Sequence, residues 1–220
     1  MSVENEIKSY ESIEIQHEKL YLLPEKAIYW AAKKLLLIAD LHLGKAAHFR
    51  KNGMAVPPQT ANRNWKKLHQ LFRLHQPQRV CFLGDLFHST ENKEWTVFGE
   101  LTQSYPDIQF ELVMGNHDIL EASAYEALGF EVYQESRIEG PFILTHEPLE
   151  EPALYNLCGH IHPGVKLSGK GRQSHKAACF YFGEKQAILP AFGSFTGLAK
   201  IPVREQDQIF VIVEDQVIPM

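Results

Sequence analysis

Five short segments of this chain carry side chains that bind metal ions, and together they could hold two ions. Aspartate, asparagine and histidine offer the oxygen and nitrogen atoms that divalent transition metals prefer. The candidate ligands are Asp40, His42, Asp85, Asn116, His146, His160 and His162. Two ions about 3.5–4 Å apart would polarise a phosphoryl oxygen, hold a hydroxide and stabilise the attacking and leaving oxygens of an in-line displacement. The residue types therefore predict phosphoester hydrolysis.

The two residues after Asn116 are candidate catalytic residues. An imidazole at His117 could stabilise the pentacoordinate transition state or protonate the leaving oxygen. Asp118 could orient that imidazole by accepting its second N–H. We therefore predict His117 and Asp118 as the catalytic pair.

The spacing of the ligands suggests how they share two ions. Side chains two residues apart face the same side of an extended segment, so we expect Asp40 and His42 to bind one ion together. His160 and His162 have the same spacing, although a slight turn could aim them at different ions. The Asp85 carboxylate can bridge two cations. Imidazole nitrogens mixed with carboxylate oxygens favour manganese, iron or zinc over calcium or magnesium, and we expect manganese.

Each ligand segment follows a short apolar run of the length that buried strands take. The runs are residues 35–39, 80–83, 110–114, 142–144 and 154–158. Because open sheets bind ligands beyond the carboxyl ends of their strands, the ligands should gather at one edge.

Helical spacing of apolar residues predicts helices over 59–75, 94–105 and 119–128, between the first strands. After residue 130 the sequence favours strands. We expect an α/β fold of two packed, mixed sheets with helices on the outside.

Length and composition bound the class of protein. A chain of 220 residues that is 45% hydrophobic and 22% charged is typical of one globular domain, which we expect to span 1–220. It has no apolar run long enough for a membrane span and no signal-like start, which favours the cytoplasm. The three cysteines have no paired spacing and indicate a reducing compartment.

The net charge of −5 gives no general attraction to nucleic acid, so DNA contact would have to be local. Lys45 and Arg50 are candidate substrate contacts, because a basic loop after the first ligand pair could meet a phosphodiester backbone. The same loop could equally be solvated surface. His88 is a further candidate substrate contact. A second basic stretch, residues 166–176, could be a flap over nucleic acid or a polar hairpin tip. We expect no nucleotide cofactor, since no helix pattern follows the glycines at 193 and 197.

The order of the blocks resembles the calcineurin-like metallophosphoesterase superfamily, whose signature is Asp-x-His, Gly-Asp, Gly-Asn-His-Asp/Glu, His and Gly-His-x-His. The resemblance implies a four-layered α/β/β/α sandwich and a catalytic role for His117. It assigns two sets of ligands that share Asp85. One ion would be held by Asp40, His42, Asp85 and His162, and the other by Asp85, Asn116, His146 and His160.

Flanking sequence resembles the PdeM family of ligase-associated DNA-damage-response metallophosphoesterases more closely. The matching stretches include residues 27–30, 38–50, 56–57 and 189–197. This resemblance implies a phosphodiesterase or endonuclease that acts on single-stranded or damaged DNA beside a DNA ligase and a helicase.

Two other functions remain open at this point. The same two-metal core would serve a small-molecule phosphodiesterase or a phosphomonoesterase, and the acidic net charge mildly favours small substrates. A non-catalytic scaffold of the same fold should show broken ligand blocks, whereas every block here is intact. The oligomeric state stays open.

Overall fold

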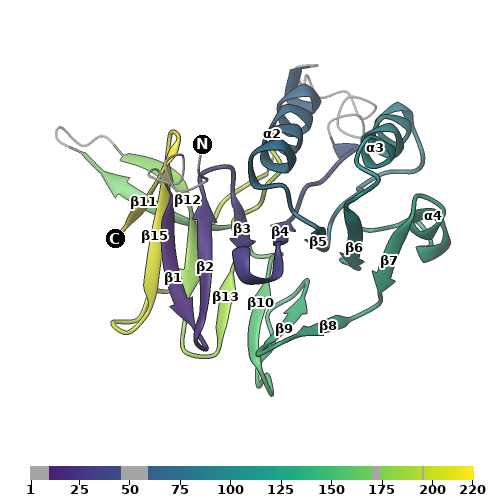
Figure 1. Cartoon of the computed structure of the whole chain (residues 1–220). Helices are drawn as coiled ribbons and strands as arrows, with labels where there is room; N and C mark the ends of the chain where they lie inside the picture. The colour runs from purple at the N-terminus through teal and green to yellow at the C-terminus, as the bar shows by residue number, and fades with distance from the viewer. Residues whose placement is uncertain (1–9, 46–58, 170–173, 195) are drawn as a thin grey trace.

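The computed structural model describes residues 10–45, 59–169, 174–194 and 196–220 (Figure 1). Two mixed sheets pack face to face. The first has seven strands in the order β1-β2-β3-β4-β5-β6-β7, antiparallel up to β4 and parallel from β4 to β7. Its strands are β1 Glu11–Ile15, β2 Glu18–Leu23, β3 Ala27–Trp30, β4 Leu35–Ala39, β5 Arg79–Leu83, β6 Gln109–Val113 and β7 Phe130–Tyr133.

The second sheet has nine strands, with β14-β11-β12-β13-β10-β9-β8 as its main order and β15 and β16 continuing from β12. Its strands are β8 Ser136–Glu139, β9 Phe142–Thr145, β10 Tyr155–Cys158, β11 Pro163–Ser168, β12 Ser174–Phe182, β13 Gln186–Ile188, β14 Ala199–Lys200, β15 Gln208–Val213 and β16 Gln216–Pro219. Strands β9, β10 and β13 are parallel to one another. Strands β8, β11, β14 and β16 were not anticipated by the sequence patterns.

Among the described residues, three α-helices connect the parallel strands of the first sheet: α2 Gln59–His75, α3 Lys93–Gln103 and α4 Ala122–Glu126. A short 3-10 helix, η3 Ala31–Lys33, joins β3 to β4. Helix α3 begins at residue 93 because the Asn92 side chain accepts hydrogen bonds from the amides of Glu94 and Trp95. Helix α4 is shorter than the expected 119–128. Figure 1 shows the helices grouped around β4 to β7, with β11 and β15 at the far end of the molecule.

Two large apolar clusters explain this layering. One cluster fills the space between the sheets, where residues such as Leu37 and Val113 meet Phe142, Leu157 and Phe180. The other lies between the first sheet and the helices. Its members include Leu36, Phe82, Leu71, Phe98 and Tyr125. Because strands β4 to β6 contribute to both clusters, they are buried on both faces, as their continuous apolar runs indicate. The α/β class and the packing of two mixed sheets with flanking helices are confirmed.

The basic stretch 166–176 lies on an antiparallel hairpin. Lys166 of β11 pairs with Lys176 of β12, and the tip residues fall outside the described part of the chain. A separate observation concerns membranes: within the described residues, no helix has the length and apolar character that crossing a bilayer requires.

Candidate dimetal site

All seven predicted ligands follow carboxyl ends of strands from both sheets. Asp40, Asp85 and Asn116 follow the adjacent parallel strands β4, β5 and β6 of the first sheet. His146, His160 and His162 follow β9 and β10 of the second. Since the two sheets stack, these six loop positions and His42 meet at one edge of the sandwich.

The ligand segments are not extended, which corrects the expectation for Asp40 and His42. Asp40, His42, Asp85, His160 and His162 all have positive φ angles, between 50° and 67°. A left-handed conformation costs about 1–2 kcal/mol per non-glycine residue. The strain is held by backbone bonds between the first two loops, since the His42 amide donates to the Asp85 carbonyl at 2.8 Å. Turned backbone, rather than strand periodicity, aims these side chains at one another.

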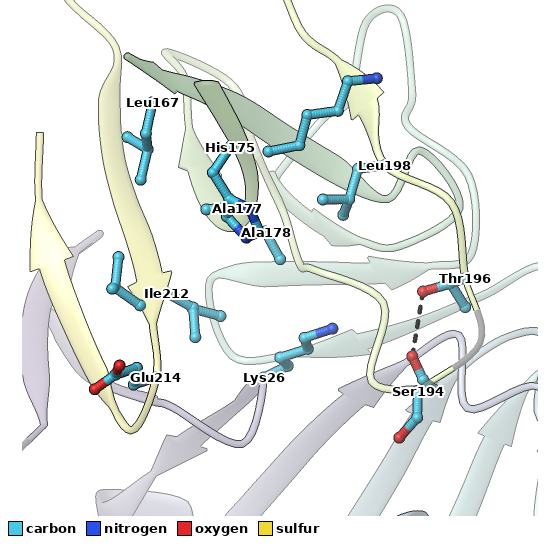
Figure 2. A pocket seen from close by; sticks show the side chains of 13 residues that line it. Lys26, Leu167, His175, Ala177, Ala178, Ser194, Thr196, Leu198, Ile212 and Glu214 are labelled. Atoms are coloured by element: carbon cyan, nitrogen blue, oxygen red, sulfur yellow. Dashed lines mark hydrogen bonds between the residues drawn. The ribbon is translucent and has the colours of Figure 1, made fainter. Parts of the chain in front are cut away.

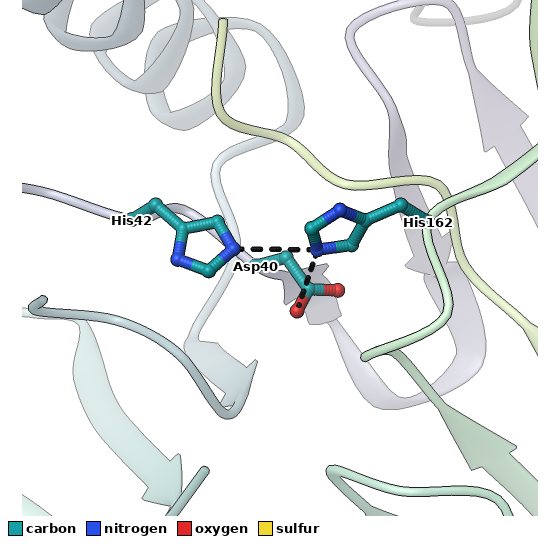
Figure 3. Close-up of side chains that lie close together, drawn as sticks. All are labelled: Asp40, His42 and His162. Carbon is teal, nitrogen blue, oxygen red and sulfur yellow. Dashed lines mark hydrogen bonds and ion pairs between the residues drawn. The ribbon is translucent and has the colours of Figure 1, made fainter. Parts of the chain in front are cut away.

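One cluster consists of Asp40, His42 and His162, whose ligand atoms all lie within 4.8 Å of one another. Figure 3 shows the two imidazoles pointing at each other above the Asp40 carboxylate. The Nε2 atom of His162 lies 3.3 Å from the Nε2 atom of His42 and 3.3 Å from Asp40 Oδ1. The arrangement directs two ring nitrogens and a carboxylate oxygen at one small volume.

A second cluster consists of Asp40, Asp85 and His146. His146 Nε2 lies 3.4 Å from Asp85 Oδ1, 2.9 Å from Asn116 Oδ1 and 3.1 Å from His160 Nδ1. Asp85 also reaches the first cluster, with its Oδ2 atom 3.7 Å from His42 Nε2. Asp85 therefore lies between the two groups of ligands, where a bridging carboxylate belongs.

The donor set fits two cations. Asp40 Oδ1 is buried and, within the described residues, accepts no hydrogen bond, because its 3.3 Å contact with His162 lacks hydrogen-bond geometry. Burial, and then the positive charges of Lys45 and His162, lower the pKa of His42 to about 2. His42 is therefore neutral and offers a lone pair. The buried carboxylates of Asp40 and Asp85 form no ion pair with a lysine or arginine among the described residues, so a bound cation would balance their negative charge.

Backbone groups fix the orientation of the ligands. His146 Nδ1 lies 3.0 Å from the Leu83 carbonyl, so Nδ1 carries the proton and Nε2 faces the cluster. The His160 amide donates to Asp40 Oδ2 at 2.9 Å. Gly159 allows this close approach, since a Cβ atom there would lie 2.6 Å from Asp40 Oδ2. The position of Gly159 directly before the ligand His160 was the signal in the sequence that could have predicted this role.

His117 lies beside the clusters. Its amide donates to Asp85 Oδ1 at 2.9 Å, and its ring stacks on the ring of His88 with centroids 4.2 Å apart. The His88 ring also lies 5.6 Å from the ring of His42. The structure thus brings the predicted catalytic histidine and one predicted substrate contact to the same wall of the site.

Asp118 does not orient the His117 ring, contrary to the prediction. Its carboxylate accepts hydrogen bonds from the amides of Leu86, Phe87 and Gly115 and from the Tyr125 hydroxyl. These four donors hold the loops after β5 and β6 together. Burial raises the pKa of Asp118, while the bonds from the Phe87 and Gly115 amides act in the opposite direction. Asp118 therefore supports the site through the backbone.

Of the remaining predicted substrate contacts, one lies in the described part of the chain and one lies outside it. Lys45 is half-buried next to the first ligand pair, where burial lowers the pKa of its ammonium and the charges of Asp85 and Asp40 oppose that effect. Arg50 lies outside the described residues.

Comparisons with protein families and solved structures identify proteins that are similar to this chain. A family model for calcineurin-like phosphoesterases matches residues 33–184. The chain is similar to the crystal structure of the Pseudomonas putida nuclease MPE, with 29% identity, coverage of 96% of this chain and 100% of that chain, and a TM-score of 0.81. It is also similar to Yfce, a phosphoesterase from E. coli, with 17% identity, coverage of 82% and 88%, and a TM-score of 0.44. A comparison with curated proteins found no match.

Proposed function

The chain belongs to the calcineurin-like phosphoesterase family, and from this premise we propose that it is a two-metal-dependent phosphodiesterase that cuts DNA as an endonuclease. The observation that carries the proposal is the pair of ligand clusters, with Asp85 between them. One Asp85 oxygen faces His42, and the other faces His146. The similarity to a nuclease over almost the full length of both chains supports a nucleic acid as the substrate, and the resemblance in sequence favours DNA. Metal binding and phosphoester hydrolysis follow from the family itself.

The roles of the residues follow from their positions. Ions bound by these ligands would neutralise charge on the phosphoryl oxygens and activate water as the nucleophile. Asp40 and His162 would hold one side of the phosphate site, and His146, with its Nδ1 proton on the Leu83 carbonyl, the other. His117, anchored by its amide to Asp85, would donate an imidazole proton to the leaving oxygen. His88 would keep the His117 ring in place by stacking.

The metal and the substrate contacts are part of the proposal. Mixed imidazole and carboxylate ligands favour manganese, with iron or zinc as alternatives. Lys45 and His88 would contact the phosphodiester, and Arg50 is proposed on sequence grounds alone.

The biological setting rests on the resemblance in sequence. We place the enzyme in DNA repair beside a ligase and a helicase, acting on single-stranded or damaged DNA. A cytoplasmic location is supported by the free, buried thiols Cys81, Cys158 and Cys179, which a reducing compartment would preserve. One domain over residues 1–220 is supported by the apolar cluster that both sheets share.

The test is hydrolysis of bis-para-nitrophenyl phosphate and of a labelled single-stranded oligonucleotide by metal-stripped protein with manganese restored. We expect both to be cut, and His117→Ala to lower kcat by roughly 10²–10⁴ on both. His69→Ala is the matched control, because His69 is an exposed histidine of α2 that bonds to Tyr105. Cleavage of the small diester alone would favour a small-molecule phosphodiesterase, and no manganese-dependent activity would contradict the proposal.

A further inference from the structure

A pocket of about 530 Å³ borders the metal ligands and plays no part in the site described above. Its walls come from the β2–β3 turn, strands β11, β12 and β15, and the segment between β13 and β14 (Figure 2). The volume is in the range of pockets that hold small ligands. Lys26, His175 and Lys176 supply positive or titratable groups, and Leu167, Leu198 and Ile212 supply apolar surface.

The segment between β13 and β14 separates this pocket from the ligands. Gly193 lines the pocket, and its amide donates to the Asp40 carbonyl at 3.0 Å. Further along the same segment, the Ala199 amide donates to the His162 carbonyl at 3.0 Å. Because a Cβ atom at Gly193 would lie 2.7 Å from the Leu41 carbonyl, this segment packs directly on the loop that carries Asp40 and His42. A substrate that is bound at the clusters and extends over these two backbone segments would meet the pocket.

Lys26 brings an ammonium group into the pocket. Figure 2 shows its side chain reaching toward Ser194 and Thr196. Among the described residues, no carboxylate lies within ion-pair distance of this ammonium group. Glu214 is the one carboxylate among the described residues that line the pocket.

The hydroxyl groups of the pocket already donate hydrogen bonds within the protein. Ser194 Oγ donates to Asn64 Oδ1 at 2.7 Å, and Thr196 Oγ1 donates to the Gly193 carbonyl at 3.2 Å. An anion in the pocket would therefore find its donors in the lysines. The hydroxyl oxygens keep lone pairs and can accept bonds from a sugar or a base.

We propose that this pocket is a subsite for a nucleotide that flanks the scissile phosphodiester, with its phosphate on Lys26 and Lys176 and its sugar and base against Leu167, Leu198 and Ile212. The inference rests on the proposed function and adds to it a requirement for substrate on both sides of the cut. A phosphate paired with apolar surface is the chemistry of a nucleotide, whereas a free phosphate would leave the apolar walls uncovered. Apart from the His175 imidazole, the described side chains that line the pocket carry no ring, so a base would lie mainly against aliphatic surface.

The test compares two substrates with one pair of matched variants. Lys26→Gln removes the charge and keeps most of the side-chain length. Lys34→Gln is the control, because Lys34 is also a lysine with positive φ but is exposed at the end of η3, outside this pocket. Each protein is loaded with manganese and assayed on bis-para-nitrophenyl phosphate and on a single-stranded oligothymidylate.

We expect Lys26→Gln to raise KM for the oligothymidylate about 10-fold, which matches the loss of one charge-assisted hydrogen bond, and to leave the small diester within about 2-fold. Lys26→Arg should restore the KM, and Lys34→Gln should behave like the wild type. An unchanged oligothymidylate KM in Lys26→Gln, or an equal loss on both substrates, would overturn the subsite alone. If the wild-type protein cuts only the small diester, the proposed function fails first and the subsite falls with it.

Discussion

The dimetal site and a second, partly buried cluster of charged side chains differ in how their charges are balanced. The second cluster consists of Arg79, Arg137, Glu111 and Glu139, which lie between the two sheets. Arg79 bonds to Glu111 at 2.7 Å and to Glu139 at 2.5 Å, and Arg137 lies 2.7 Å from both glutamates. These two positive and two negative side chains balance there, and Lys33 lies 3.8 Å from Glu139 as a further positive group. At the dimetal site, the carboxylates of Asp40 and Asp85 face imidazoles and form no ion pair with a lysine or arginine among the described residues.

The difference shows how a structural cluster can be told from a functional one. In the Arg–Glu cluster every charge has an opposite partner, although the Arg137–Glu111 contact is an ion pair rather than a well-aligned hydrogen bond. Burial lowers the pKa of Arg79, but the hydrogen bonds that Arg79 donates to Glu111 and Glu139 raise it above its usual value. The dimetal site leaves Asp40 Oδ1 without a hydrogen bond among the described residues. Buried carboxylates that form no ion pair with a lysine or arginine among the described residues therefore mark the place where an external cation would stabilise the fold.

The largest effect should come from removing the central carboxylate of the dimetal site. We expect Asp85→Asn to lower hydrolysis by about 10³-fold or more, because the neutral amide bridges cations poorly. The Asn side chain can still accept the His117 amide that Asp85 Oδ1 accepts. Metal content by mass spectrometry and kcat would be measured together. In the metal-free state the variant should be no less stable than the wild type. A large loss of stability there would contradict the distinction between a functional and a structural cluster.

The converse change is Glu111→Ala in the Arg–Glu cluster. Removing one partner of a buried ion pair typically costs about 3–5 kcal/mol of unfolding free energy, because Arg79 and Arg137 would be left with less compensation. Urea unfolding would measure the loss. The kcat of the folded fraction should stay close to wild type. A fall in kcat as large as that of Asp85→Asn would contradict the separation of roles.

A smaller effect should follow from Gly159→Ala. The added methyl group would lie 2.6 Å from Asp40 Oδ2 and 2.7 Å from the Ala39 Cβ atom, so the carboxylate has to move. We expect metal affinity to fall about 10–100-fold, as for other changes that disturb ligand orientation. Calorimetric titration with manganese would measure it. The control is Gly129→Ala, because a Cβ atom at Gly129 meets no atom within 4 Å, although its φ of +86° adds backbone strain that stability measurements would report. An unchanged affinity in Gly159→Ala would mean that Asp40 tolerates displacement.

The smallest effect concerns stability in acid. Burial raises the pKa of Glu139, but the hydrogen bond from Arg79 and the charges of Arg79 and Arg137 outweigh burial and lower this pKa below its usual 4.5. A carboxyl group with a lowered folded-state pKa stabilises the fold fully above the unfolded value and less as the pH falls below it. Stability should therefore decline below about pH 4.5 more steeply in the wild type than in Glu139→Gln. Thermal unfolding between pH 3 and pH 7 would measure this, and parallel curves would contradict it.

Several features of the fold could be predicted from sequence because they depend on local pattern. Helix α2 begins and ends at the predicted residues 59 and 75, since the apolar spacing and Pro77 define it. Strand β4 matches residues 35–39 for the same reason. Strands β8, β11, β14 and β16 of the second sheet lack a strong apolar pattern in the sequence, because they are short, polar or at sheet edges. Their pairing depends on neighbours distant in the chain.

By itself, the sequence determined which side chains could bind metal and that each would follow a strand, because ligand chemistry and apolar runs are written residue by residue. Only the tertiary structure decided how these side chains converge. The left-handed backbone at Asp40 and His42, the four donors that occupy Asp118, and the pairing of Arg79 with Glu139 all depend on contacts between loops or sheets. The pocket beside Gly193 has the same origin. Such contacts join residues far apart in the chain, and no local pattern encodes them.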